Sequence, residues 1–239
     1  KNGLPKYMMP LAYFFAFSGV IAGLPAFQAN QVVQLTNDLY FPDVENFSFI
    51  AGAFLVVITA AVVLGGLKRI ANVSALLVPF MGGLYLVAVL IAVMLNYQQF
   101  FPALGLIVTE AFSFDSAVVG GLVGVILTGI KRGAFSNEAG IGTEALIHGA
   151  AKTSNPVKQG LIAMTGPIFD TLIMCTLTAV IILISGVYQT SDSQGVTLTS
   201  EAFLTTLGPV GPIILFVCVV SFGLSTIFTY SYYGSSCAK

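Results

Sequence analysis

The feature that most constrains this chain is a series of long apolar runs with almost no charged side chains. They cover residues 7–33, 49–67, 70–95, 160–187 and 208–233. In hydrocarbon every backbone amide needs an internal partner, and a helix needs about 20 apolar residues to cross the bilayer. Each run is therefore predicted to form a membrane-spanning helix, and the expected fold class is an all-α integral membrane protein.

The charged residues are too few for a water-soluble domain. They make up 8% of the 239 residues, whereas about 25% is usual in soluble domains. The net charge of −1 lacks the basic excess that binding to nucleic acid phosphates requires. One histidine and three cysteines, with no Cys/His motif among them, predict neither a zinc site nor a disulfide framework.

The sign of the charges alternates from one connecting segment to the next, as the positive-inside rule predicts for successive loops on opposite sides of a membrane. Basic residues occur before the first run, at 68–69 and at 152–158, and acidic residues at 38–45, 110–115 and 192–201. The chain is thus expected to begin and end in the cytoplasm, with one more crossing between residues 115 and 152. No signal peptide is visible, and the protein is expected in the cell membrane.

The additional crossing is expected to be broken. Its first apolar segment, within 117–132, has about 14 uncharged residues that reach only about 21 Å at about 1.5 Å each, and a second segment covers 138–151. Gly133, Gly140 and Gly142 surround the polar residues 136–138 and lower the helix propensity there. Such backbone at membrane depth lines a protein-buried or wet cavity, and in transporters it indicates a site for a small zwitterion. The alternative is a continuous, glycine-kinked helix that points Glu138 into a polar seam.

Several motifs resemble the alanine or glycine:cation symporter family, over nearly the whole chain. They are residues 28–30 (QAN), 65–71 (GGLKRIA), 132–142 (RGAFSNEAGIG), 148–153 (HGAAKT), 156–161 (PVKQGL), 170–176 (DTLIMCT) and 231–234 (SYYG). The resemblance implies a LeuT-like inverted-repeat helical bundle that couples sodium flow to uptake of alanine or glycine. It further implies that this chain is a fragment covering about the third to eighth core helices, with the break in the sixth.

The same resemblance suggests the substrate contacts. An amino acid in this fold lies against the unwound sixth helix, which indicates Phe135, Ser136, Asn137, Glu138 and Gly140. Glu138 has two interpretations: it is a partner of the ligand amine or cation, or it is a structural acceptor for unwound amides. A buried carboxylate is costly without partners in either case. By the resemblance, Gln28 is also a substrate contact.

Two pairs of residues are candidate sodium ligands. Asp170 lies within an apolar run, where an ionisable group is a functional hypothesis, and the resemblance pairs it with Ser136. The alternative is an ion pair of Asp170, for example with Arg132. Ser225 and Thr226 offer adjacent hydroxyls for a second sodium site; alternatively, these hydroxyls bond back to the carbonyls of the preceding turn.

The predicted function is a sodium-coupled symporter that imports a small neutral amino acid by alternating access, and not an enzyme. Its expected partners are the amino acid, sodium as coupling ion and the lipid bilayer, with no cofactor and no nucleic acid. One alternative is a transporter of the same fold with another small substrate or with proton coupling. Another is a channel or a non-transporting membrane protein.

Overall fold

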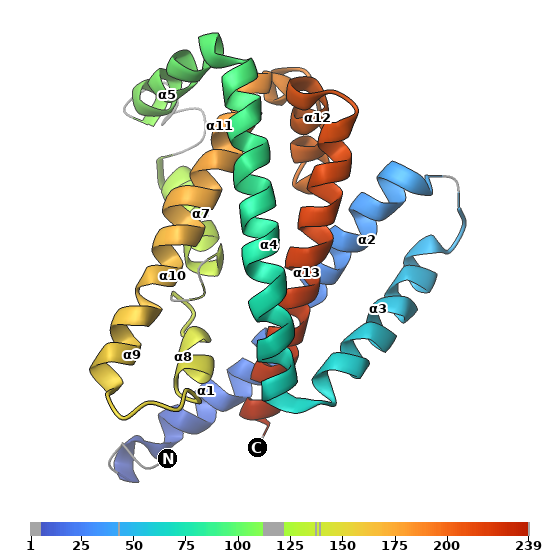
Figure 1. Ribbon diagram of the computed structural model, residues 1–239. Helices are drawn as coiled ribbons and strands as arrows, with labels where there is room; N and C mark the ends of the chain where they lie inside the picture. The colour runs from blue at the N-terminus through green and yellow to red at the C-terminus, as the bar shows by residue number, and fades with distance from the viewer. Residues whose placement is uncertain (1–5, 43, 112–121, 137, 139, 239) are drawn as a thin grey trace. The chain divides into compact units, whose positions relative to one another are not determined.

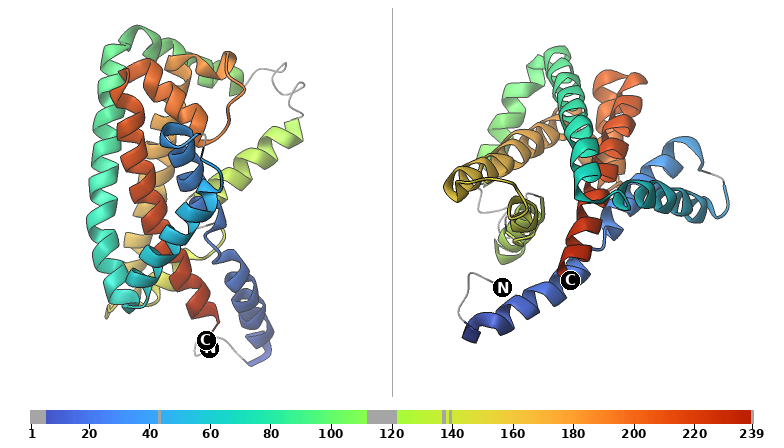
Figure 2. Two further views of the ribbon diagram at one scale, coloured as in Figure 1. Left: turned by 90° about the vertical axis from the view of Figure 1, so that its right-hand side faces the viewer. Right: turned by 60° about the horizontal axis from the view of Figure 1, so that its bottom comes forward.

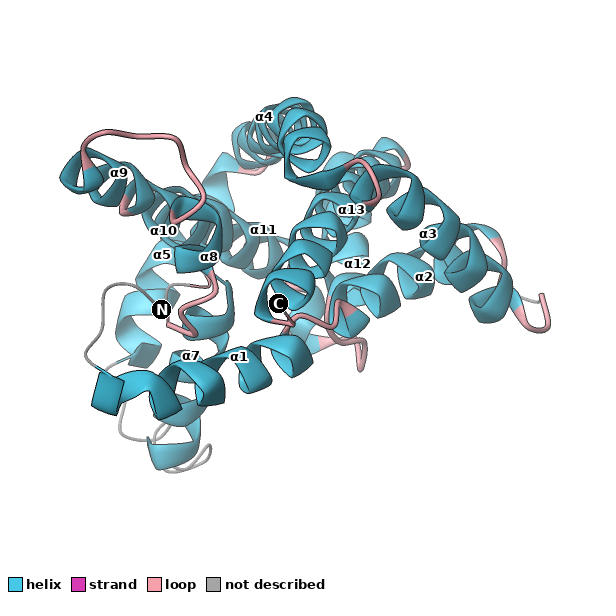
Figure 3. Ribbon diagram, turned by 90° about the horizontal axis from the view of Figure 1, so that it is seen from below, coloured by secondary structure: helices cyan, strands magenta, loops and turns pink. Residues whose placement is uncertain are grey.

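The computed structural model of the chain describes residues 6–42, 44–111, 122–136, 138 and 140–238. In this part of the chain the secondary structure is helical throughout, with no strand (Figure 3). The α-helices are α1 (Met9–Ala22), α2 (Ala26–Tyr40), α3 (Phe47–Val63), α4 (Gly66–Leu95), α5 (Tyr97–Ala111), α7 (Leu122–Ser136), α8 (Glu144–His148), α9 (Pro156–Ala163), α10 (Thr165–Pro167), α11 (Thr176–Ser185), α12 (Val196–Leu207) and α13 (Val210–Cys237). Two 3-10 helices, η1 (Lys6–Met8) and η3 (Val187–Gln189), and a π-helix, η2 (Ile168–Cys175), complete the chain order.

Four helical stretches of the described chain are long and apolar enough to cross a bilayer. They are Met9–Tyr40, Gly66–Leu95, Pro156–Ser185 and Val210–Cys237. Phe47–Val63 is a shorter apolar helix, and none of its residues is buried, as expected of a helix that faces lipid. The prediction of an all-helical membrane protein is confirmed.

The chain divides into two compact units, one formed by residues 1–84 and 216–239 and the other by residues 85–215. In the first unit, the predicted run 7–33 is interrupted at residues 23–25, and the second helix extends to Tyr40. Pro25, which has no backbone N–H, directly precedes α2. Helices α2 and α3 lie side by side as a hairpin (Figure 1).

Small residues allow α1 to approach α13 closely (Figure 2). A Cβ atom added to Gly23 would lie 2.7 Å from the backbone nitrogen of Gly234. Close backbone contact through small residues is typical of helix packing in membranes, where the hydrophobic effect does not drive association. Close backbone contact between the end of α1 and α13 therefore helps to stabilise the first unit.

In the second unit, helices α11 and α12 lie side by side, and the C-terminal part of α4 contacts both. The ring centroid of Tyr85 lies 5.6 Å from that of Phe203 on α12. The hydroxyl of Tyr85 lies 2.6 Å from Oγ1 of Thr178 on α11. A buried tyrosine that has both an aromatic neighbour and a hydroxyl partner fixes the relative positions of these three elements.

Helices α9, α10, η2 and α11 follow one another as a single interrupted helix (Figure 1). Met164 separates α9 from α10, and Pro167, the last residue of α10, lacks the N–H that a regular α-helix would use there. The hydroxyl of Thr165 donates a hydrogen bond of 2.7 Å to the carbonyl of Ile162. After Pro167 the backbone hydrogen bonds change from the α-helical pattern, i to i+4, to the π-helical pattern, i to i+5, which we call the π register.

Glu201 lies on α12, outside the candidate membrane spans, and is held by the preceding loop. Hydrogen bonds from Ser191 and Ser193 lower the pKa of Glu201 below its ordinary value of 4.5, because they stabilise the ionised carboxylate. The Ser193 hydroxyl donates to Oε1 over 2.6 Å. The ionised form of Glu201 thus stabilises the connection into α12.

Candidate cation and substrate site

The residues expected at the break lie around the end of α7. This helix ends at Ser136 and regular α-helix resumes only at Glu144, so the chain is not continuously helical across this region. Asn137 lies outside the described residues, as does the side chain of Phe135, so the structure gives no contacts for either. α8 has five residues and is much shorter than the segment 138–151 expected from the sequence.

The geometry of the turn explains this shortening. Glu138 adopts a φ of 58° and Gly142 a φ of 79°, both in the left-handed region that ends regular helices. The carbonyl of Glu138 accepts hydrogen bonds from the amides of Ile141, at 3.2 Å, and Gly142, at 2.9 Å. These bonds close a turn in place of the expected helix.

The structure brings Ser136 and Asp170 together. The Ser136 hydroxyl donates a hydrogen bond to Oδ2 of Asp170, with 2.5 Å between the two oxygens. Asp170 lies on η2, which contacts α7. A carboxylate and a hydroxyl supply the oxygen ligands that hard cations prefer. The side chain of Arg132, the alternative partner of Asp170, lies outside the described residues.

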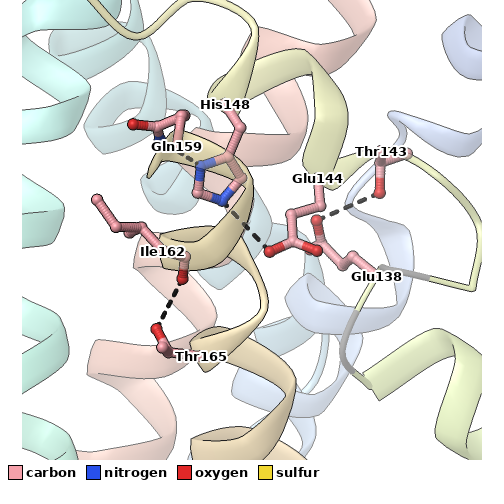
Figure 4. Close-up of polar contacts among 7 residues, drawn as sticks. All are labelled: Glu138, Thr143, Glu144, His148, Gln159, Ile162 and Thr165. Carbon is pink, nitrogen blue, oxygen red and sulfur yellow. Dashed lines mark hydrogen bonds and ion pairs between the residues drawn. The ribbon is translucent and has the colours of Figure 1, made fainter. Parts of the chain in front are cut away.

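The carboxylate of Glu138 is anchored within its own turn (Figure 4). The Thr143 hydroxyl donates to Oε2 of Glu138 over 3.2 Å, and Thr143 is only 2% exposed. This bond fits the interpretation of Glu138 as a structural acceptor.

Gly140, predicted as a substrate contact, lies against another part of the protein. A Cβ atom added to Gly140 would lie 2.5 Å from the Cβ and 2.8 Å from the Cα of Ala134. Real Cβ atoms do not come that close, so glycine permits the turn to fold back against α7. Beyond its chain neighbours and the backbone of its own helix, no atom lies within 4 Å of the corresponding position at Gly133, seven residues earlier.

A histidine network beside the turn was not assigned to the site from the sequence. Nε2 of His148 lies 3.3 Å from Oε1 of Glu144, and Nδ1 lies 2.7 Å from Nε2 of Gln159 on α9 (Figure 4). Both ring nitrogens therefore have partners, as expected of a satisfied interfacial histidine. The spacing of Glu144 and His148 at i and i+4 was the signal that could have identified this pair.

The remaining candidates lie in the first unit. Gln28 is buried, and its backbone carbonyl oxygen lies 3.8 Å from where a Cβ atom added to Gly223 would be, on the face of α2 that packs against α13. Ser225 is buried, and its hydroxyl donates to the carbonyl of Phe222 over 2.9 Å. Thr226 is half-buried on α13. The Ser225 bond is the back-bonding alternative expected for hydroxyls in membrane helices, although its oxygen keeps lone pairs that can accept.

Comparison with known proteins identifies the family of this chain. The profile described as the sodium:alanine symporter family matches residues 1–239. The chain belongs to this family. Members of the sodium:alanine symporter family are transporters and not enzymes, and this one is a multi-pass protein of the cell membrane.

Individual relatives agree with the family assignment. The chain is 39% identical to the sodium/alanine symporter AgcS of Methanococcus maripaludis, over 99% of this chain and 53% of the relative. It is 40% identical to the amino-acid carrier protein AlsT of Bacillus subtilis, over 76% of this chain and 39% of the relative. It is 37% identical to the "Probable sodium/glutamine symporter GlnT" of Bacillus subtilis, over 77% of this chain and 38% of the relative. The chain thus spans about half the length, or less, of these relatives.

Proposed function

We propose that this member of the family is a sodium-coupled symporter that imports a small neutral amino acid, alanine or glycine, by alternating access. The name of the AgcS relative supports both alanine and sodium. The broken helix supports the mechanism, because discontinuous helices near the bilayer midplane form the binding sites of many secondary transporters. A LeuT-like inverted-repeat bundle is the architecture that we propose for the whole transporter.

The observation that carries this proposal is the contact between Ser136 and Asp170. It joins the end of α7, where the helix breaks, to a carboxylate within an apolar span. A carboxylate in that position is costly unless it has a function or a partner. We assign these two side chains to a sodium site at the break, where bound sodium would offset the carboxylate charge.

The amino acid would bind beside this site. Exposed amides at a helix break favour a carboxylate, and carbonyls at the opposing end favour an ammonium group. The segment Phe135 to Gly140 would supply this backbone, with the carboxylate of Glu138 as a partner for the substrate amine. Gly140 contributes by letting the turn fold against Ala134.

A second sodium site would use Ser225 and Thr226. Their adjacent positions on α13 offer two hydroxyl oxygens, and oxygen ligands suit a hard monovalent cation. In this site Ser225 would keep its bond to the Phe222 carbonyl and offer a lone pair to the ion.

Uptake into proteoliposomes tests the proposed function. The protein is expressed at its full natural length, and radiolabelled alanine is offered under an inward sodium gradient or with sodium replaced by choline at fixed pH. Saturable accumulation above the external concentration, with sodium only, is expected. Accumulation driven by a pH gradient in choline would instead indicate proton coupling, and equilibration without accumulation would indicate a channel. Competition by unlabelled glycine and glutamine then compares the substrates suggested by the family and by the GlnT relative.

A further inference from the structure

Ser136 contacts two side chains of the same helical segment. Its hydroxyl oxygen lies 2.5 Å from Oδ2 of Asp170 and 3.4 Å from Sγ of Cys175. The two partners are five positions apart on η2, at the third and the last residue of the segment. Cys175 is exposed, whereas Cys218 is buried and Cys237 is intermediate.

This arrangement depends on the π register. On an α-helix with 3.6 residues per turn, side chains five positions apart point about 140° away from each other. In a π-helix the hydrogen bonds join residues i and i+5, so the turn is wider and the side chain of residue i+5 points much closer to the direction of residue i than it does in an α-helix. Asp170 and Cys175 can therefore both face Ser136 because the segment Ile168–Cys175 is π-helical.

The directions of the hydrogen bonds define what Cys175 does. The Ser136 hydroxyl has one proton, which it donates to Asp170. The contact with Cys175 then has the thiol as donor and the Ser136 oxygen as acceptor. The thiol thereby holds the hydroxyl in the orientation that directs its proton to the carboxylate.

We propose that the π register of Ile168–Cys175 makes Cys175 a positioning residue of the candidate sodium site, by orienting the Ser136 hydroxyl toward Asp170. This inference rests on the proposed role of Ser136 and Asp170 in binding sodium. Cys175 is thereby added to the residues of the site, and the π-helix explains why it can reach Ser136. The helical register and the sodium requirement of uptake can be measured separately.

Oxidative cross-linking tests the register without any transport measurement. In the full-length protein with Cys218→Ser and Cys237→Ser, Ser136→Cys is combined with the native Cys175. The matched control has Ser136→Cys with Ile173→Cys and Cys175→Ser. A protease site inserted at residues 149–155 separates the two helices, so that a disulfide formed with copper phenanthroline keeps the fragments joined on a non-reducing gel.

The π register predicts cross-linking through Cys175 and little through Ile173→Cys. In an α register anchored at Asp170, position 173 would point about 60° from Asp170 and position 175 about 140°, so the preference would reverse. Cross-linking mainly through Ile173→Cys, or through neither position, would overturn the proposed register.

Sodium titration of alanine uptake tests the positioning role. Cys175→Ala removes the donor and is expected to raise the sodium concentration for half-maximal uptake by about threefold or more, a typical effect of one hydrogen bond. The maximal rate at saturating sodium should stay within about twofold. Cys175→Ser keeps a donor and should restore the wild-type sodium requirement.

The outcomes separate this inference from the proposed function. An unchanged sodium requirement in Cys175→Ala, or an equal loss of maximal rate and yield in both variants, would overturn the positioning role while leaving sodium coupling intact. Wild-type uptake that does not depend on sodium would overturn the proposed function and this role with it, whereas the cross-linking result would still report the register.

Discussion

The hydroxyl of Ser136 donates its proton to the carboxylate of Asp170, 34 positions later in the chain, with 2.5 Å between the oxygens. This contact joins the end of α7 to the π-helix η2. It places a carboxylate from an apolar span beside interrupted helical backbone.

The first prediction compares two glycines near the break. Gly140→Ala should destabilise the protein by about 1–3 kcal/mol, because the added Cβ would overlap Ala134. Gly133→Ala should be neutral or stabilise by up to about 1 kcal/mol, because its position is open and lies inside α7. Thermal unfolding of the purified variants in detergent measures both changes. Equal effects at the two positions would mean that the turn does not pack against α7.

The second prediction concerns the bond between Thr143 and Glu138. Thr143→Val keeps the shape of the buried side chain but removes the donor. It should destabilise the protein by about 1–2 kcal/mol. In a double-mutant cycle with Glu138→Gln, the coupling energy should be about 0.5–1.5 kcal/mol. A coupling energy near zero would indicate that the carboxylate is held by other partners.

The third prediction concerns the hydroxyls of α13. Changing Ser225 and Thr226 to alanine together should raise the sodium concentration for half-maximal uptake about tenfold, since each lost oxygen ligand weakens cation binding. The alanine requirement at saturating sodium should change little. Thr229→Ala is the control, because its hydroxyl donates to the Ser225 carbonyl over 3.0 Å and should not affect the ion. If Thr229→Ala has the same effect, helix packing and not ion binding explains the result.

The fourth prediction is a pH dependence outside the membrane spans. The lowered pKa of Glu201 means that its contribution to stability is complete above pH 4.5 and is lost as the pH falls through the lower pKa of the folded state. Ser193→Ala should therefore reduce the unfolding temperature at pH 7, and the difference from wild type should shrink as the pH falls below about 4.5.

Thr205→Ala is the matched control for this pH dependence. Its hydroxyl donates to the backbone carbonyl of Glu201 over 2.9 Å and does not touch the carboxylate. The effect of Thr205→Ala should therefore be independent of pH in the same unfolding series. A Ser193→Ala difference that is constant from pH 7 to pH 3.5 would argue against the ionised carboxylate as its source.

The sequence predicted those features that depend on composition and periodicity. Apolar runs and Pro or Gly positions indicated the membrane helices and an interruption near residues 136–142, and the family resemblance paired Ser136 with Asp170. The π register of η2 was not predictable, because patterns of hydrophobic residues assume 3.6 residues per turn. Without that register, nothing in the sequence placed Cys175 beside Ser136.

Other details depended on contacts that a single sequence does not reveal. Gly140 stays a predicted substrate contact, and the approach of Ala134 to it is a tertiary contact. The Glu144–His148 pair was visible as an i, i+4 spacing, yet Gln159 joins it from a different helix. Local spacing predicts such pairs only within one helix.

The most direct test of the sodium site is the effect of sodium on thermal unfolding. Purified wild-type protein, Ser136→Ala, Asp170→Asn and the control Asp192→Asn are melted in sodium chloride or in choline chloride of equal ionic strength. A ligand at 100 times its Kd stabilises the folded state by about 2.7 kcal/mol. We expect sodium to raise the unfolding temperature of wild type and Asp192→Asn, to have a smaller effect on Ser136→Ala and to have almost none on Asp170→Asn. An undiminished sodium effect in Asp170→Asn would contradict the assignment of the cation to Ser136 and Asp170.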